Sequence, residues 1–228
     1  MSFLKKVAAG IMSAAFLFTP LAGHADYYGT LIEEEDGTYW YENGKKQGVP
    51  GDPKNITDVR YGIERGREIY DPTTDAWYWL DACYNGRVAK SKEVWFPYIY
   101  QDEVPGSTNG KWVRYDHWGR MVKGWCCRRM PVTNNLTGQT YDQWVLYLYK
   151  YGTGEMFYGF FGSINGKQMY FMPLIGTCVQ EDVIMDFCAL HPNEWCYDAT
   201  NGEYIQLSKL GGRIGFDILS RLNPPKFS

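Results

Sequence analysis

Hydrophobic and polar positions alternate in short blocks along most of this chain. Each block holds an aromatic-rich run, then a turn of Asn, Asp, Thr and Gly, then a second run that often carries Met, Val or Ile. Alternation of this kind predicts half-buried β-strands, and two such runs around a turn predict a hairpin. The blocks lie at residues 36–49, 67–98, 109–125, 143–160, 165–172 and 194–207.

The turn residues support the hairpins. Asn-Gly occurs at positions 43–44, 85–86, 109–110, 165–166 and 201–202. Two-residue hairpin turns need positive φ at their central residues, which Asn and Gly tolerate best. The dipeptides at 109–110 and 165–166 precede an aromatic run, so each either forms a hairpin tip or joins two units.

An isolated two-stranded hairpin is only marginally stable in water. Successive hairpins must therefore bury the aromatic residues of one unit against the next, as in repeat proteins. We expect an all-β fold built as an array of stacked β-hairpins, similar to a β-solenoid, over residues 26–228. The turn-rich stretches 50–62 and 101–108 are expected to be loop inserts on this array.

Composition agrees with a β fold. Aromatic residues make up 17% of the chain, with 19 tyrosines, and glycines number 25. Tyr and Trp favour strands, and Gly allows tight turns.

The first 25 residues are typical of a secretory signal peptide. Lys5 and Lys6 precede an apolar run at 7–18, and Gly23 and Ala25 supply the small residues of the expected cleavage site. That run is shorter than the roughly 20 residues of a membrane span, and no second apolar segment of membrane length follows. We therefore expect a protein that does not span the membrane, is secreted, and stays extracellular or bound to the cell wall.

Charge limits the partners. Without Lys5 and Lys6, 21 basic residues face 26 acidic ones, a net charge of about −5. A mildly acidic chain without a basic cluster argues against nucleic acid, because phosphate neutralisation drives that binding.

Six cysteines in an exported chain make disulfides plausible, and their pairing cannot be read from sequence. Cys178, Cys188 and Cys196 lie close enough along the chain to form a C-terminal staple. A zinc site is the competing hypothesis, but the spacing of the cysteines lacks paired C-x-x-C motifs. No metal or other cofactor is expected.

Three segments resemble the cell-wall-binding repeats of Gram-positive bacteria, the family of choline-binding and glucan-binding modules. They are Gly110–Trp125 (GKWVRYDHWGRMVKGW), Trp144–Gly159 and Trp195–Tyr204. The usual unit is close to W-Y-Y-F-D-x-x-T-G-x-M-x-x-G-W. The last segment departs from it, with Cys196 at an aromatic position and Tyr204 at the Met position. The resemblance implies a cell-wall polymer as partner, either choline-bearing teichoic acid or a glycan.

The resemblance also implies that ligands bind in grooves between consecutive hairpins. Ring faces attract a quaternary ammonium such as choline, and a sugar ring stacks on an aromatic surface. Strand alternation places Trp112 and Tyr115 on opposite faces, so core packing and ligand contact stay open for each ring. The candidate ligand-binding residues are Trp77, Trp79, Trp112, Tyr115, Trp125, Trp144 and Tyr147.

Other functional classes have less support. A small secreted hydrolase would need a catalytic set of residues, and the mature chain keeps only His117 and His191 without a nucleophile motif. A structural or adhesive surface protein that binds another protein is the main alternative, because stacked hairpins present a long face. The sequence favours a non-catalytic binding module.

Overall fold

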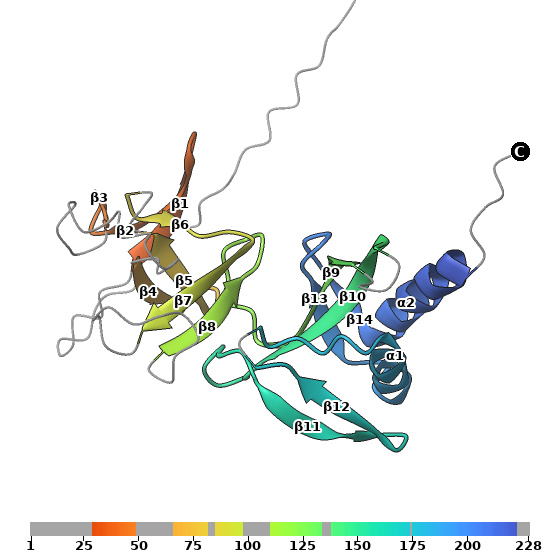
Figure 1. Cartoon of the computed structure of the whole chain (residues 1–228). Coiled ribbons are helices and arrows are strands. Elements are labelled where there is room, and N and C mark those ends of the chain that lie inside the picture. Colours follow the sequence, from red (N-terminus) through yellow and green to blue (C-terminus); the bar gives the residue numbers. More distant parts are fainter. Residues whose placement is uncertain are drawn as a thin grey trace, which may run out of the picture.

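The computed structural model describes residues 29–48, 66–81, 85–97, 110–133, 138–173 and 175–222. Strands predominate among them, and antiparallel hairpins follow one another along the chain (Figure 1). The predicted all-β array of hairpins is therefore confirmed. The predicted signal peptide and both predicted loop inserts lie outside the described residues.

Six strands form the first sheet: β1 (Gly29–Glu34), β2 (Gly37–Glu42), β3 (Lys45–Lys46), β4 (Gly66–Asp71), β5 (Ala76–Asp81) and β6 (Arg87–Val88). The hairpins β1–β2 and β4–β5 are antiparallel, and β6 lies between β2 and β5. The second hairpin is thus joined to the first through backbone hydrogen bonds, as stacking of units requires.

Three more hairpins follow, made of β7 (Lys92–Pro97), β8 (Gly110–Tyr115), β9 (Gly124–Thr133), β10 (Thr140–Tyr149), β11 (Gly159–Ile164) and β12 (Lys167–Phe171). The pairs β7–β8, β9–β10 and β11–β12 are each antiparallel. Asn165 and Gly166 form the tip between β11 and β12, with φ of 49° and 78°. This dipeptide is therefore a hairpin tip and not a junction between units.

The C-terminal hairpin, β13 (Trp195–Asp198) with β14 (Glu203–Gln206), leaves the series. Strand β13 pairs in parallel with β9, so that Cys196 lies opposite Trp125. The result is a four-stranded sheet in the order β10-β9-β13-β14. The last hairpin thus folds back on the array.

Two helices, α1 (Glu181–Leu190) and α2 (Leu207–Leu222), were not expected from the sequence. Helix α2 buries Leu207, Leu210 and Ile214, which recur at helical spacing. The helices approach closely, because a Cβ on Gly211 would lie 3.1 Å from the Cβ of Cys188. They lie together at the opposite end of the molecule from β1 (Figure 1).

The largest core cluster fills the space between β9–β10, β11–β12 and the helices. The Trp125 ring lies at its centre, 4.5 Å from the ring of Phe187 and 6.4 Å from that of Phe171. Helix α1 thus packs Phe187 on Trp125, and α2 adds Leu207, Leu210 and Ile214 to the same cluster.

One packing step repeats from unit to unit, and we call it the docking step. Four Gly-x-apolar triads follow the aromatic strands β5, β8, β10 and β12, at residues 86–88, 119–121, 154–156 and 176–178. A Cβ on Gly154 would lie 2.3 Å from Sδ of Met121, and one on Gly176 would lie 2.3 Å from Sδ of Met156. The last residue of each triad thus packs directly beneath the glycine of the next triad.

Hydrogen bonds fix the same step. The backbone N–H of Met121 donates to the carbonyl of Trp77 (2.7 Å), and that of Met156 donates to the carbonyl of Trp112 (2.9 Å). In the same way, the backbone N–H of Cys178 donates to the carbonyl of Leu146 (2.8 Å). These three triads are therefore each held in register on the aromatic strand of the unit before them.

Candidate aromatic binding site

A pocket of about 300 Å³ opens where the docking step joins Met121 to Trp77, and we call it the Trp77 pocket. Three parts of the chain meet there: the turn before β5, the triad after β8, and strand β14. Its lining residues are Thr74, Asp75, Ala76, Trp77, Arg120, Met121, Lys123 and Tyr204. Trp77 and Tyr204 are each 37% exposed, so both rings keep surface for a ligand.

The turn between β4 and β5 positions Trp77. Buried Asp71 accepts hydrogen bonds from the backbone N–H of Thr73 (2.9 Å) and the hydroxyl of Thr74 (2.8 Å). The turn closes at Asp75, which has a φ of 49°. This arrangement is an Asx turn, which replaces the hydrogen bonds that the chain loses at the tip.

Tyr70 extends the aromatic surface next to Trp77. The two ring centroids are 5.3 Å apart with a tilt of 45°, and Tyr70 is 43% exposed. The Tyr70 hydroxyl donates to the Asp75 carboxylate (2.6 Å), and this hydrogen bond raises the pKa of Tyr70 above its ordinary value. The ring is thus held by its polar end, which leaves its face open.

Arg120 forms the opposite wall, held by a fully buried carboxylate. Asp116 accepts the backbone N–H of Trp118 and of Arg120 at 2.9 Å each, and Nε of Arg120 at 3.0 Å. The guanidinium carbon lies 4.4 Å from the Trp118 ring centroid and 5.8 Å from that of Tyr204. Those two rings are nearly parallel, with an interplanar angle of 12°. A side-chain cation therefore already faces this aromatic pair.

Five of the predicted ligand-binding residues are in the core: Trp79, Tyr115, Trp125, Trp144 and Tyr147 are each no more than 5% exposed. The polar ends of four of these rings bond within the protein, as in the bond from Nε1 of Trp144 to Asp217 (2.7 Å); the four are Tyr115, Trp125, Trp144 and Tyr147. Trp112 is half-buried, with its ring 5.6 Å from that of Trp95. Among the seven, Trp77 has the most open ring.

Sequence reasoning missed the other walls of the pocket. The sequence identifies Tyr204 only as a departure from the repeat, and Arg120, Tyr70 and Trp118 are not among the predicted ligand-binding residues. Tyr204 is the last residue of a Gly-x-Tyr segment at 202–204, which is similar to the Gly-x-apolar triads. This similarity is the sequence signal that could have pointed to a contact with another unit. What brings it to Trp77 is the pairing of β13 with β9, which is not a local property of the sequence.

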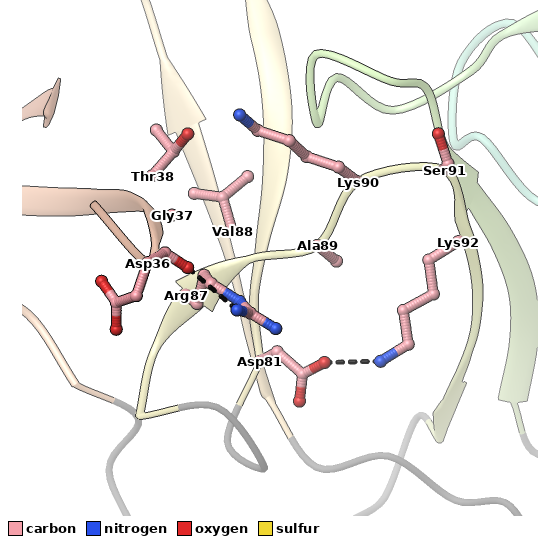
Figure 2. Close-up of a pocket in the computed structure, with 10 residues that line it drawn as sticks. All are labelled: Asp36, Gly37, Thr38, Asp81, Arg87, Val88, Ala89, Lys90, Ser91 and Lys92. Atoms are coloured by element: carbon pink, nitrogen blue, oxygen red, sulfur yellow. Dashed lines mark hydrogen bonds and ion pairs between the residues drawn. The ribbon is translucent and has the colours of Figure 1, made fainter. Parts of the chain in front are cut away.

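A second pocket, of about 430 Å³, lies between β2, β6 and β7 (Figure 2). It is lined by Asp36, Gly37, Thr38, Asp81 and residues 87–92, without an aromatic ring. Lys92 pairs with buried Asp81 (2.5 Å), and Arg87 donates to the carbonyl of Asp36 (2.9 Å). These charges hold the first units together, so the Trp77 pocket is the better candidate site.

The predicted cysteine staple is not formed in the structure. Cys178, Cys188 and Cys196 have free, buried thiols, as do Cys126 and Cys127. Cys178 bridges to β10, Cys188 lies on α1 and Cys196 on β13, so the sequence proximity of the three does not bring their sulfur atoms into a bond. No group of His, Cys, Asp or Glu among the described residues is arranged to hold a metal ion.

No protein-family model and no curated protein matches the sequence. Among solved structures, CbpJ from Streptococcus pneumoniae TIGR4 is 13% identical, with 77% of this chain and 62% of that chain covered and a TM-score of 0.26. Choline binding protein F from the same species, with a peptidoglycan analogue, is 21% identical over 77% and 57%, with a TM-score of 0.19.

The modular Cpl-1 endolysin, complexed with a peptidoglycan analogue, is 16% identical over 62% of this chain and 40% of that one, with a TM-score of 0.18. The chain thus spans 40% to 62% of the length of these three proteins. Choline-binding proteins are among the structures that it is similar to, with only loose superposition. In the described part of the chain, no helix is both long and apolar enough to cross a bilayer.

Proposed function

We propose that this chain is a secreted, non-catalytic binding module that attaches to the bacterial cell surface. It holds a cell-wall polymer, through choline or a glycan, in an aromatic groove between hairpins. The observation that carries the proposal is the Trp77 pocket, which the partly exposed Trp77 and Tyr204 line together beside a docking step. The motif in Gly110–Trp125, which supplies Met121 to this pocket, also supports it.

The proposal covers the organisation of the chain as well. Residues 1–25 are removed as a signal peptide, and residues 26–228 form the wall-binding array. Of the predicted ligand-binding residues, we assign contact to Trp77 and keep Trp112 as a weaker contact, because it is half-buried. The five buried rings hold the array together.

The affinity of one pocket should be low. Each good aromatic contact contributes about 0.5–2 kcal/mol, and two or three such contacts correspond to a dissociation constant on the order of 1 mM. Retention on a wall therefore depends on a polymer that presents many copies of the ligand, which raises the apparent affinity.

The experiment measures how much purified protein is retained on isolated Gram-positive cell walls, for the wild type, Trp77→Ala and Trp195→Ala. We expect Trp77→Ala to lose roughly tenfold in retention, as the removal of one aromatic contact implies. Trp195 is the matched control, because it is 59% exposed and does not line the pocket.

Thermal melting of the three proteins separates binding from folding. Trp77 is exposed enough that its truncation should leave the melting temperature near that of the wild type. The proposal fails if the wild type is not retained on walls, or if Trp77→Ala and Trp195→Ala are retained equally.

A further inference from the structure

We propose that the Trp77 pocket binds an uncharged sugar ring and excludes a quaternary ammonium group, because Arg120 already occupies the position of a bound cation. The inference rests on the proposed function and chooses between its two ligand classes. It makes Arg120 a residue that determines specificity.

The first observation is the aromatic pair that Arg120 faces. A quaternary ammonium is held by the faces of several rings around one point. Here the guanidinium of Arg120 is already within 4.4 Å and 5.8 Å of the centroids of Trp118 and Tyr204. A second cation in the Trp77 pocket would have to share Tyr204 with it, at close range to a like charge.

The second observation is how firmly this cation is held. Asp116 is fully buried, and its two oxygen atoms receive two backbone N–H groups and the Arg120 side chain. Displacing the guanidinium would leave that carboxylate without its counter-ion in a buried site, which is costly. Arg120 is therefore a fixed part of the wall.

The third observation is the charge of the remaining lining. Lys123 is exposed at the pocket and joins no ion pair among the described residues, while the single carboxylate of the lining, Asp75, already accepts the Tyr70 hydroxyl. Arg120 is balanced by Asp116, and Lys123 and Asp75 carry opposite charges. The rim therefore has no excess negative charge that would draw in an ammonium group.

The same groups suit a sugar. Trp77 offers a flat apolar face, and Asp75, Lys123 and Arg120 place an acceptor and donors around it. A sugar ring needs this combination, since its apolar face stacks on a ring while its hydroxyl groups bond to polar neighbours. An uncharged ring also meets no repulsion from either cation.

The test uses saturation-transfer NMR on one sample that contains tetramethylammonium chloride and the tetramer of N-acetylglucosamine. The proteins are the wild type, Arg120→Gln and Arg120→Lys. In the wild type we expect transfer to the sugar and none to the ammonium methyl groups. Arg120→Gln removes the cation and should raise the affinity for tetramethylammonium by roughly tenfold, whereas Arg120→Lys keeps the charge and should behave as the wild type.

The inference is overturned if the wild type shows transfer to tetramethylammonium, if it shows none to the sugar, or if folded Arg120→Gln gains no ammonium signal. If Arg120→Gln fails to fold, the wild-type sample alone still decides between the two ligands. Wall retention, measured on the same preparation, keeps the proposed function separate. A wild type that is retained on walls but binds tetramethylammonium refutes the sugar specificity and leaves wall binding standing.

Discussion

Replacing Gly154 by Ala tests whether the docking step holds neighbouring units together. Gly154 has a φ of 65°, and a Cβ there would lie 2.3 Å from Sδ and 2.7 Å from Cγ of Met121. Met121 is only 8% exposed and lies in a core cluster with Trp79 and Tyr115. Its side chain therefore has little room to move away.

Two costs add in Gly154→Ala. A non-glycine residue at positive φ costs roughly 1–2 kcal/mol, and overpacking a filled core costs about 1–3 kcal/mol. We expect the free energy of unfolding to fall by about 2–5 kcal/mol in total. Gly166→Ala is the matched control, because Gly166 has a φ of 78° with no atom within 4 Å of the added Cβ. It should show the first cost alone.

The assay is urea unfolding followed by tryptophan fluorescence, with the double variant Gly154→Ala/Met121→Ala completing a mutant cycle. Shortening Met121 removes the clash, so the two changes should be coupled by about 1–3 kcal/mol. Equal losses in Gly154→Ala and Gly166→Ala, together with additive effects in the cycle, would show that the contact between units contributes nothing.

Two further predictions concern buried groups. Burial raises the pKa of Cys188 to about 12 and that of Cys196 well above its ordinary value. Iodoacetamide should therefore leave both thiols unmodified in the native protein and label them in urea, as measured by intact mass. Labelling of the native protein would contradict the packing. Burial also raises the pKa of Tyr115 and Tyr149. In the unfolded chain a tyrosine hydroxyl has a pKa of about 10, whereas the folded protein keeps these two hydroxyls protonated above that pH. The unfolded state is therefore favoured as the pH rises above about 10, and the urea midpoint should fall. An unchanged midpoint would contradict this.

The hairpins could be predicted from sequence because their signals are local. The alternation of a strand and the Asn-Gly pair of its turn each involve only a few neighbouring residues. The Asn-Gly pair at 165–166 forms a hairpin tip, which is one of the two roles that the sequence allowed it. The helices were missed for two reasons. Helix α1 has only 10 residues, and its apolar positions adjoin cysteines that suggested a disulfide staple. In α2, Gly211, Gly212 and Gly215 lower the intrinsic helix propensity.

The site was harder to predict, because ring exposure depends on contacts between units. Trp77 and Trp79 are two residues apart on one strand, yet Trp77 is 37% exposed and Trp79 is fully buried. The difference comes from which units cover each ring. Tyr204 reaches the pocket only because β13 pairs with β9, a contact across about 70 residues of chain.

The spacing of the docking steps has a consequence for how such a chain can change. The glycines of successive triads are separated by 33, 35 and 22 residues, yet each packs on the triad before it. The contact between neighbours is thus independent of the length of polypeptide that connects them. We therefore expect insertions and deletions between the steps to leave these contacts intact as long as each Gly-x-apolar triad is kept.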